Sequence, residues 1–249
     1  MSETILKLEE GYKKTEAGMV IMNHLNLEVK KGDFITILGG NGAGKSTLFN
    51  SISGKLQLTS GRVFINNKNV TNLSEEKRAD YLGRVFQDPK QGTAPRMTVS
   101  ENLLLASLRG EKRRFSLRKL KENGDVFYKL CQRIGNGLEN HLDTPSGNLS
   151  GGQRQALSLL MSTIKQPEIL LLDEHTAALD PKTATQIMTL TEKIVAENQL
   201  TCLMITHRME DALKYGNRMI VLEQGQVKYD INKEEKEKLE MSDLLSFFN

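Results

Sequence analysis

The 249-residue sequence contains no tryptophan, two cysteines and five prolines, and 5% of its residues are aromatic. Cys131 and Cys202 form neither a metal-ligand pattern nor a disulfide framework, so we expect two reduced structural thiols. The sequence also lacks a run of about 18 apolar residues, which a membrane-spanning helix needs. Its first residues show no basic region followed by an apolar stretch, so we expect no signal peptide.

Neither sign of charge dominates, because 34 basic and 31 acidic residues leave a formal net charge of +3. So small a balance gives no argument for nucleic acid or for an anionic membrane, and we expect no nucleic-acid partner. The length suits one large α/β domain, or a core with a subdomain, around a substantial hydrophobic core. We therefore expect a soluble chain, which would need another polypeptide to span any membrane at which it works.

Short apolar runs alternate with helical patterns along the chain. The runs begin at Phe34, Glu168, Thr201 and Arg218. Continuous apolar strands of this kind suit a sheet covered on both faces, so they predict a mainly parallel α/β core. Strand signals vanish from about 98 to 166, which predicts a mostly helical inserted subdomain.

Two predicted helices have readable starts. Thr98 and Glu101 are spaced as a capping box, and Asp180 is a candidate N-cap followed by Pro181 in the first turn. After Gly225 the sequence predicts a short strand over 226–230, a charged stretch, and a final "LLSFF" suited to one short docked helix. The apolar face predicted for the helix after Asp180 consists of Ala184, Ile187, Met188, Ile194 and Val195.

Residues 39–46, "GGNGAGKS", fit the pattern G-x-x-x-x-G-K-[ST] between a predicted strand and a predicted helix. The backbone N–H groups of such a P-loop surround a β-phosphate, Lys45 reaches the β and γ oxygens, and the Ser46 hydroxyl ligates Mg²⁺. A plain glycine-rich turn is the alternative, which the strand and helix context disfavours. The residues expected to bind nucleotide here are Gly39, Asn41, Gly42, Ala43, Gly44, Lys45, Ser46 and Thr47.

Two acids, Asp173 and Glu174, end the apolar strand "ILLLDEH". Open α/β sheets bind ligands at such strand ends, where one carboxylate can hold magnesium and a second can polarise an attacking water. A second glycine-rich segment, "NLSGGQRQ" at 148–155, opens a predicted helix near Ser150. The positive end of that helix attracts an anion, so one chain carries two phosphate cradles.

With "LSGGQ" at 149–153, the sequence resembles the nucleotide-binding subunits of ATP-binding cassette (ABC) transporters from about Ile5 to Asp230. The resemblance implies an α/β P-loop NTPase core of mainly parallel sheet, with an N-terminal antiparallel β-subdomain and an inserted helical subdomain. It implies one ABC ATPase domain over 1–249, with 1–97 and 167–230 as catalytic core, 98–166 as helical signature subdomain and 231–249 as tail. Cassettes of this family pair head to tail, and each ATP lies between the P-loop of one and the signature loop of the other.

The resemblance also implies roles for residues that match the family's motifs. Gln87 matches the Q-loop glutamine, which reaches Mg²⁺ or the attacking water, and Glu174 matches the catalytic glutamate. His207 matches the switch histidine, which contacts the γ-phosphate and orients the water. The implied catalytic residues are Lys45, Gln87, Glu174 and His207, and the implied metal ligands are Ser46, Gln87 and Asp173.

The remaining matches concern adenine and the dimer. Tyr12 matches the aromatic residue that stacks on adenine, with a solvent-exposed turn tyrosine as the alternative. Asp180 matches the D-loop aspartate, which communicates across the dimer. The signature residues implied to line the nucleotide bound by the partner are Ser150, Gly151, Gly152 and Gln153.

Two features depart from the family or stand outside its motifs. His175 replaces the proline usual after the catalytic glutamate, and we favour a structural substitution over a titratable group near the site. The basic segment 109–121 is interpreted as a solvated helix face, with a surface for anionic headgroups or a membrane partner as the alternative.

The function implied is ATP hydrolysis that powers solute transport through a separate integral-membrane permease, with ATP and Mg²⁺ as cofactors. The segments "DPKQGTAPRMTVSENLLLA" and "DEHTAALDP" resemble importer cassettes for small polar solutes, in the branched-chain amino acid group and a related, little-characterised set. Implied partners are a second cassette, in a homodimer, and an extracellular or periplasmic solute-binding protein. The implied location is peripheral, at the cytoplasmic face of the cell membrane.

One alternative is a soluble cassette ATPase that drives protein assembly, as in iron–sulfur cluster formation. Gln153 counts against it, because family members with that role tend to carry an acid there. Relatives in DNA repair insert long coiled coils between P-loop and signature, and the stretch from Lys45 to Ser150 is too short for them. A catalytically dead subunit is disfavoured because Glu174 and His207 are both present.

Overall fold

The computed structural model describes residues 3–111 and 120–248, which form two compact units. Within these residues, the first unit comprises the chain up to 82, then 168–174, then 199 onward, and the second comprises 83–167 and 175–198. The described part of the helical subdomain predicted at 98–166 lies in the second unit. One boundary between the units falls in the sequence between Glu174, a predicted catalytic residue, and His175.

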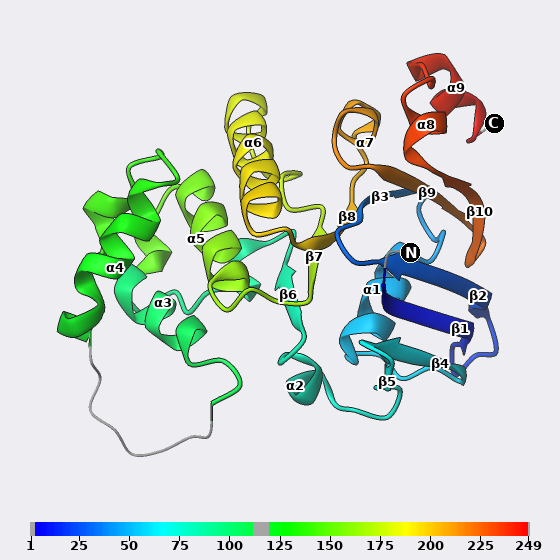
Figure 1. The fold of residues 1–249 in the computed structure, drawn as a ribbon, viewed down its shortest axis with the longest axis horizontal. Helices are drawn as coiled ribbons and strands as arrows, with labels where there is room; N and C mark the ends of the chain where they lie inside the picture. The colour runs from blue at the N-terminus through cyan, green and yellow to red at the C-terminus, as the bar shows by residue number, and fades with distance from the viewer. Residues whose placement is uncertain (1–2, 112–119, 249) are drawn as a thin grey trace. The chain divides into compact units, whose positions relative to one another are not determined.

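Two sheets build the first unit. An antiparallel sheet has the order β2-β1-β4-β5, drawn in blue and cyan in Figure 1. In the larger sheet β3 pairs parallel with β8 and β9, β7 pairs parallel with β8, and β10 joins β9 antiparallel. The strands are β1 (Thr4–Lys14), β2 (Val20–Lys30), β3 (Phe34–Gly39), β4 (Ser60–Ile65), β5 (Lys68–Asn69), β7 (Ile169–Asp173), β8 (Thr201–Ile205), β9 (Arg218–Glu223) and β10 (Gln226–Ile231). A further strand, β6 (Leu82–Val85), contains the boundary between the units.

The larger sheet of the first unit is covered on both faces, as its continuous apolar strands predict. Every residue of β3 and β8 is buried. Ile35 and Ile37 of β3 belong to a core shared with α1 and the antiparallel sheet, whereas Leu38 belongs to a second core shared with α7 and α9. The helices of this unit are α1 (Lys45–Ser53), α2 (Glu75–Arg78), α7 (Met209–Lys214), α8 (Lys233–Lys236) and α9 (Met241–Ser246). The predicted mainly parallel α/β core is confirmed.

The second unit is helical in its described residues between 98 and 166, as predicted, apart from an isolated bridge of Thr98 with Pro145. Its helices are α3 (Val99–Ser107), α4 (Leu120–Gln132), α5 (Gly151–Thr163) and α6 (Pro181–Glu197), with 3₁₀ turns at Pro89–Gln91, Leu138–His141 and Ser146–Asn148. The predicted capping box forms, with Thr98 Oγ1 accepting the Glu101 N–H at 3.2 Å and Glu101 Oε2 accepting the Thr98 N–H at 2.9 Å. Buried residues of α3, α4 and α5 form one hydrophobic core, and these three helices are drawn in green in Figure 1.

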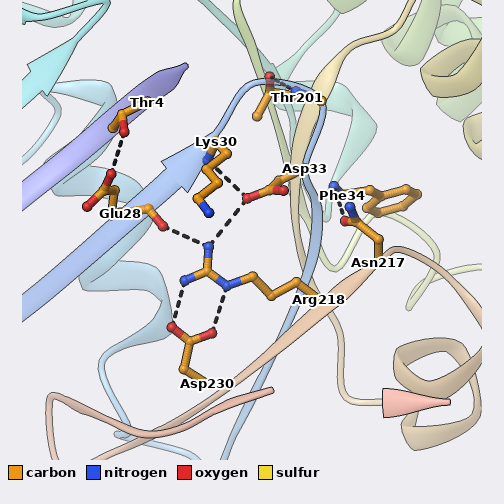
Figure 2. Close-up of polar contacts among 10 residues, drawn as sticks. Thr4, Glu28, Lys30, Asp33, Phe34, Thr201, Asn217, Arg218 and Asp230 are labelled. Carbon is orange, nitrogen blue, oxygen red and sulfur yellow. Dashed lines mark hydrogen bonds and ion pairs between the residues drawn. The ribbon is translucent and has the colours of Figure 1, made fainter. Parts of the chain in front are cut away.

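A polar cluster fixes the amino end of the larger sheet. The guanidinium of Arg218, at the start of β9, donates two hydrogen bonds to Asp230 at 2.7 and 2.6 Å (Figure 2). It also donates to the carbonyl of Glu28 at 2.7 Å and to Asp33 at 3.3 Å. The bidentate bond to Asp230 is the main cause that raises the pKa of Arg218. One side chain thereby joins β2, β9, β10 and the turn before β3.

Membrane spans are absent from the described helices, because no helix within 3–111 and 120–248 is both long enough and apolar enough to cross a membrane.

The two cysteines are free thiols, as the sequence predicts. Cys131 and Cys202 are buried, and burial raises the pKa of Cys131 to about 12, so the thiol form is favoured. Most of the basic segment 109–121 lies outside the described residues.

Candidate nucleotide-binding and hydrolysis site

The P-loop connects the carboxyl end of β3 to the first turn of α1. Gly42 and Gly44 adopt positive φ values of 80° and 99°, a conformation that favours glycine. A Cβ on Gly39 would lie 2.7 Å from the carbonyl oxygen of Leu222 in β9. Glycine is therefore required here by close backbone approach as well as by chain reversal. A glycine-rich turn of this kind before a helix N-terminus is suited to bind a phosphate through backbone N–H groups.

Lys45, the first residue of α1, is 7% exposed and lies inside the loop. Its Nζ donates hydrogen bonds to the carbonyls of Gly39 at 2.7 Å and Gly40 at 3.0 Å. Burial is the largest effect on the pKa of Lys45 and lowers it, while the carboxylates of Glu174 and Asp173 oppose that shift. The ammonium group thus interacts electrostatically with Asp173, which ends β7, and with Glu174, which follows it.

Asp173, Glu174 and His207 converge at the same carboxyl end of the sheet. Asp173 is the last residue of β7 and pairs with Ile205 at the end of β8, and His207 follows two residues later. His207 Nε2 lies 2.6 Å from Glu174 Oε1, with side chains 48% and 17% exposed. Glu174 adopts a left-handed backbone with φ 48°, and its N–H donates to the Ile205 carbonyl at 3.1 Å. A carboxylate held this way, near solvent and against an imidazole, is suited to orient a water molecule.

The signature loop begins α5 in the second unit. Ser150 Oγ accepts the Gln153 N–H at 3.3 Å, and Gln153 Oε1 accepts the Ser150 N–H at 3.2 Å. This capping box holds the first turn while the Ser150 hydroxyl retains its own proton for donation to an anion. A Cβ on Gly152 would lie 2.4 Å from Cγ2 of Thr183, so glycine is also required by packing against α6.

Three other predicted site residues are exposed or half-buried. Asp180 caps α6 by accepting the Thr183 N–H at 3.1 Å, and the hydrogen bonds from Thr183 lower the pKa of its carboxyl. Gln87 is exposed in a bend of the second unit. The ring of Tyr12 is half-buried in β1 and stacks on the imidazole of His24 at 5.1 Å. The first unit therefore brings together Lys45, Asp173, Glu174 and His207, and the second carries Gln87, Asp180 and the signature loop.

His175 is 2% exposed, and burial lowers its pKa to about 4. A neutral, buried imidazole agrees with the structural substitution favoured above rather than with titration near neutral pH.

Arg154 was missed by the sequence analysis. Its guanidinium donates to the carbonyls of Ser146 at 2.9 Å, Gly147 at 2.6 Å and Leu149 at 3.2 Å. These carbonyls belong to the segment that enters the signature loop, so Arg154 holds the loop's amino-terminal side. Its position in the first turn of a glycine-opened helix was the available signal, but nothing in the sequence identifies the carbonyls as its partners.

Comparison with protein families gives a match to one family model. The model described as "ABC transporter" matches residues 22–177. This range begins in β2 and ends just after the acids of β7, and so contains the P-loop, Gln87, the signature loop, Asp173 and Glu174.

Curated relatives cover nearly the whole chain. The tyrosine transport ATP-binding protein of Clostridioides difficile (strain R20291) is 46% identical over 229 residues, which cover 92% of this chain and 90% of the relative. The phosphonates import ATP-binding protein PhnC of Lactococcus lactis subsp. cremoris (strain SK11) is 33% identical and covers 91% of this chain and 92% of the relative.

Solved structures agree with the fold. The ADP conformation of MJ1267, an ATP-binding cassette of an ABC transporter, aligns over 100% of both chains with a TM-score of 0.81 and 26% identity. A dimeric post-hydrolysis state of the ATP-binding cassette MJ0796, bound to ADP and Pi, has a TM-score of 0.78 and 30% identity, covering 92% of this chain and 99% of that one. The likeness extends over β-sheets and helical subdomain alike.

Proposed function

Because the chain belongs to the ABC transporter family, as an ATP-hydrolysing subunit, we propose that it powers import of an amino acid, with tyrosine as the first candidate. The observation that carries this proposal is the 46% identity to a tyrosine transport ATP-binding protein over 92% of the chain. The phosphonate import relative is 33% identical, which makes phosphonates the less favoured substrate class.

For ATP binding, we assign the phosphates to the P-loop and Lys45. The backbone N–H groups of residues 39–47 surround the β-phosphate, and the Lys45 ammonium exchanges loop carbonyls for phosphate oxygens. Tyr12 stacks on adenine, with its ring already oriented by His24.

A magnesium ion fits the residues at this edge of the sheet. The Ser46 hydroxyl and the Asp173 carboxylate are hard oxygen donors of the kind Mg²⁺ prefers, and Asp173 is close enough to Lys45 to influence the lysine's pKa. Gln87 is the third assigned ligand. When bound, the ion neutralises charge on the phosphates.

For hydrolysis, we assign Glu174 as the base that orients and polarises the attacking water. His207, 2.6 Å from Glu174, holds the carboxylate and contacts the γ-phosphate. These residues act chiefly by positioning and by stabilising charge.

The assigned assembly is a head-to-tail homodimer, in which Ser150, Gly151, Gly152 and Gln153 of one copy contact the ATP on the other. The capped N-terminus of α5 supports this role, because it presents backbone N–H groups and a hydroxyl toward an anion. Asp180 links the two sites across the dimer. The dimer docks on a permease at the cytoplasmic face of the membrane, and a solute-binding protein delivers the substrate.

The test captures partners and then measures transport. Glu174→Gln protein is incubated with ATP and Mg²⁺, recovered from solubilised membranes, and its companions are identified. The proposal expects a polytopic permease and a solute-binding protein. These are reconstituted in vesicles with the unmodified chain, and ATP-driven uptake of tyrosine, leucine and a phosphonate is compared.

Tyrosine uptake above the other two supports the proposal. Preferential phosphonate uptake would replace the substrate, and recovery of soluble partners alone would replace transport by a protein-assembly role.

A further inference from the structure

The residue after the proposed catalytic glutamate is anchored differently from the glutamate itself. Glu174 belongs to the first unit and is held there by its N–H bond to the Ile205 carbonyl at 3.1 Å. Its φ of 48° is a left-handed conformation that is unfavourable for a residue with a side chain, so the flanking chain must hold it. On the carboxyl side that chain is His175, in the second unit.

His175 is tied to the middle of α6. Its Nε2 lies 3.0 Å from Oγ1 of Thr191, a residue with 0% exposure. Thr191 Oγ1 also lies 2.8 Å from the carbonyl of Ile187 and must donate its single proton there, because a carbonyl can only accept. Thr191 is then an acceptor toward His175. The imidazole therefore carries its proton on Nε2.

We propose that His175 is a positioning residue for Glu174: its Nε2–H bond to Thr191 fastens the chain after the glutamate to α6. The left-handed backbone of Glu174 is then fixed on both sides, by Ile205 before the side chain and by His175 after it. The inference rests on the proposed role of Glu174 in hydrolysis.

The same anchor connects Glu174 to the helix that follows the D-loop residue Asp180. Helix α6 begins at Pro181, directly after its N-cap Asp180, and carries Thr191 in its interior. The same helix thus holds the assigned dimer contact at its start and the anchor of the glutamate within its body. A proline at position 175 has no donor with which to make this connection.

Four variants separate positioning from packing. His175→Phe fills the space without a donor, and Thr191→Val keeps the shape without an acceptor. His175→Gln places an amide N–H near the position of Nε2 and is the conservative replacement. Thr189→Val is the matched control, since Thr189 makes the same type of bond, to Thr185 at 3.0 Å on the exposed face of α6.

We expect His175→Phe and Thr191→Val each to lower kcat about tenfold to a hundredfold, because small displacements of a catalytic group cost rates of that order. KM for ATP should stay close to that of the unmodified protein, whereas Thr191→Val should lower the melting temperature by a few degrees, because it leaves the buried His175 N–H without an acceptor. The kcat of the double variant His175→Phe/Thr191→Val should be no lower than that of either single variant. His175→Gln should recover much of the lost kcat, and Thr189→Val should have the kcat of the unmodified protein.

Unchanged kcat in His175→Phe and Thr191→Val would overturn the proposal, and so would a lowered kcat that His175→Gln does not restore. Imidazole ¹⁵N shifts provide a readout independent of activity, and a proton on Nδ1 would also overturn it. Glu174→Gln is measured beside them. A normal rate in that variant refutes the role of Glu174, whereas a slow Glu174→Gln with a normal His175→Phe refutes the positioning role alone.

Discussion

The two ends of the larger sheet in the first unit use charge in opposite ways. At the amino end, Arg218 is matched by a bidentate carboxylate, a second carboxylate and a carbonyl (Figure 2). At the carboxyl end, Lys45 is held by carbonyls of its own loop and faces two acids. Pairing raises the pKa of Arg218, whereas burial lowers that of Lys45. The charges at the amino end hold strands together. The charges at the carboxyl end can exchange their present partners for groups of a bound ligand.

The largest expected effect is at the carboxyl end. Glu174→Gln should lower ATP hydrolysis about 10²- to 10⁴-fold, the range for loss of a general base, while ATP affinity and melting temperature stay nearly constant. Phosphate release measures the rate of hydrolysis, and equilibrium ATP binding measures the affinity. Glu223→Gln is the control, because Glu223 ends β9 at the same edge but pairs with Lys228 on the surface. A Glu174→Gln protein with an unaltered rate contradicts the assignment.

Arg218→Met tests the amino end. It removes the guanidinium that Asp230 and Asp33 share, although Asp33 keeps the Lys30 N–H and Asp230 is partly exposed, so unfolding in urea should show a loss of about 2–3 kcal/mol. The ATPase rate per folded molecule should remain within about twofold, since breaking a joint does not alter the reacting groups. Lys228→Met, which breaks an exposed ion pair, should cost less than about 1 kcal/mol. If Arg218→Met lost ATPase activity without losing stability, the two ends of the sheet would not differ in function as described.

Lys236, which bonds to the segment before β9, tests through the pH dependence of stability how burial affects a charge at the amino end. It is 5% exposed, donates to the Tyr215 and Gly216 carbonyls before β9, and burial lowers its pKa to about 8 from 10.5. Between these values the unfolded chain binds the proton and the folded chain does not, so this residue's contribution to stability rises with pH. The stability of the unmodified protein relative to Lys236→Met should rise by up to about 3 kcal/mol from pH 7.5 to 10.5. An equal difference at both pH values would mean that burial leaves this pKa unchanged.

The smallest expected effect comes from a neutral group at the amino end. Thr201 Oγ1 accepts the Gly32 N–H at 3.1 Å, in the turn between β2 and β3. Thr201→Val leaves that N–H without its partner and should cost about 1–2 kcal/mol of unfolding free energy, with no change in hydrolysis per folded molecule. Thr4→Val, which removes an exposed hydroxyl bonded to Glu28, should cost less. If Thr201→Val and Thr4→Val lowered the free energy of unfolding equally, burial of the Thr201 hydroxyl would contribute little to stability.

Sequence patterns predicted the elements whose signals are local. The apolar runs at 34, 168, 201 and 218 became β3, β7, β8 and β9, since continuous burial leaves a continuous apolar record. The caps of α3 and α6 were predicted for the same reason, because N-cap and N3 lie within one turn. The P-loop followed from its glycines and its place between strand and helix.

Buried polar groups with distant partners were not predicted. Arg78 is 1% exposed and donates to the carbonyls of Ser51 and Ile52 at the end of α1, at 2.6 and 2.8 Å. In the sequence it is one of several charged residues around a short helix. Neither its burial nor its partners have a local signature, and the same holds for Arg154 and Arg218.

The sequence alone determined the order of the elements, the two glycine-rich loops and the residue types at the strand ends, since these depend on neighbours within a few positions. Tertiary structure decided which of these residues meet. It placed His207 against Glu174, closed Arg218 onto Asp33 and Asp230, and buried His175 against Thr191. Backbone conformation and side-chain contact at these points are set by packing between segments far apart in the chain, and a local pattern carries no record of that packing.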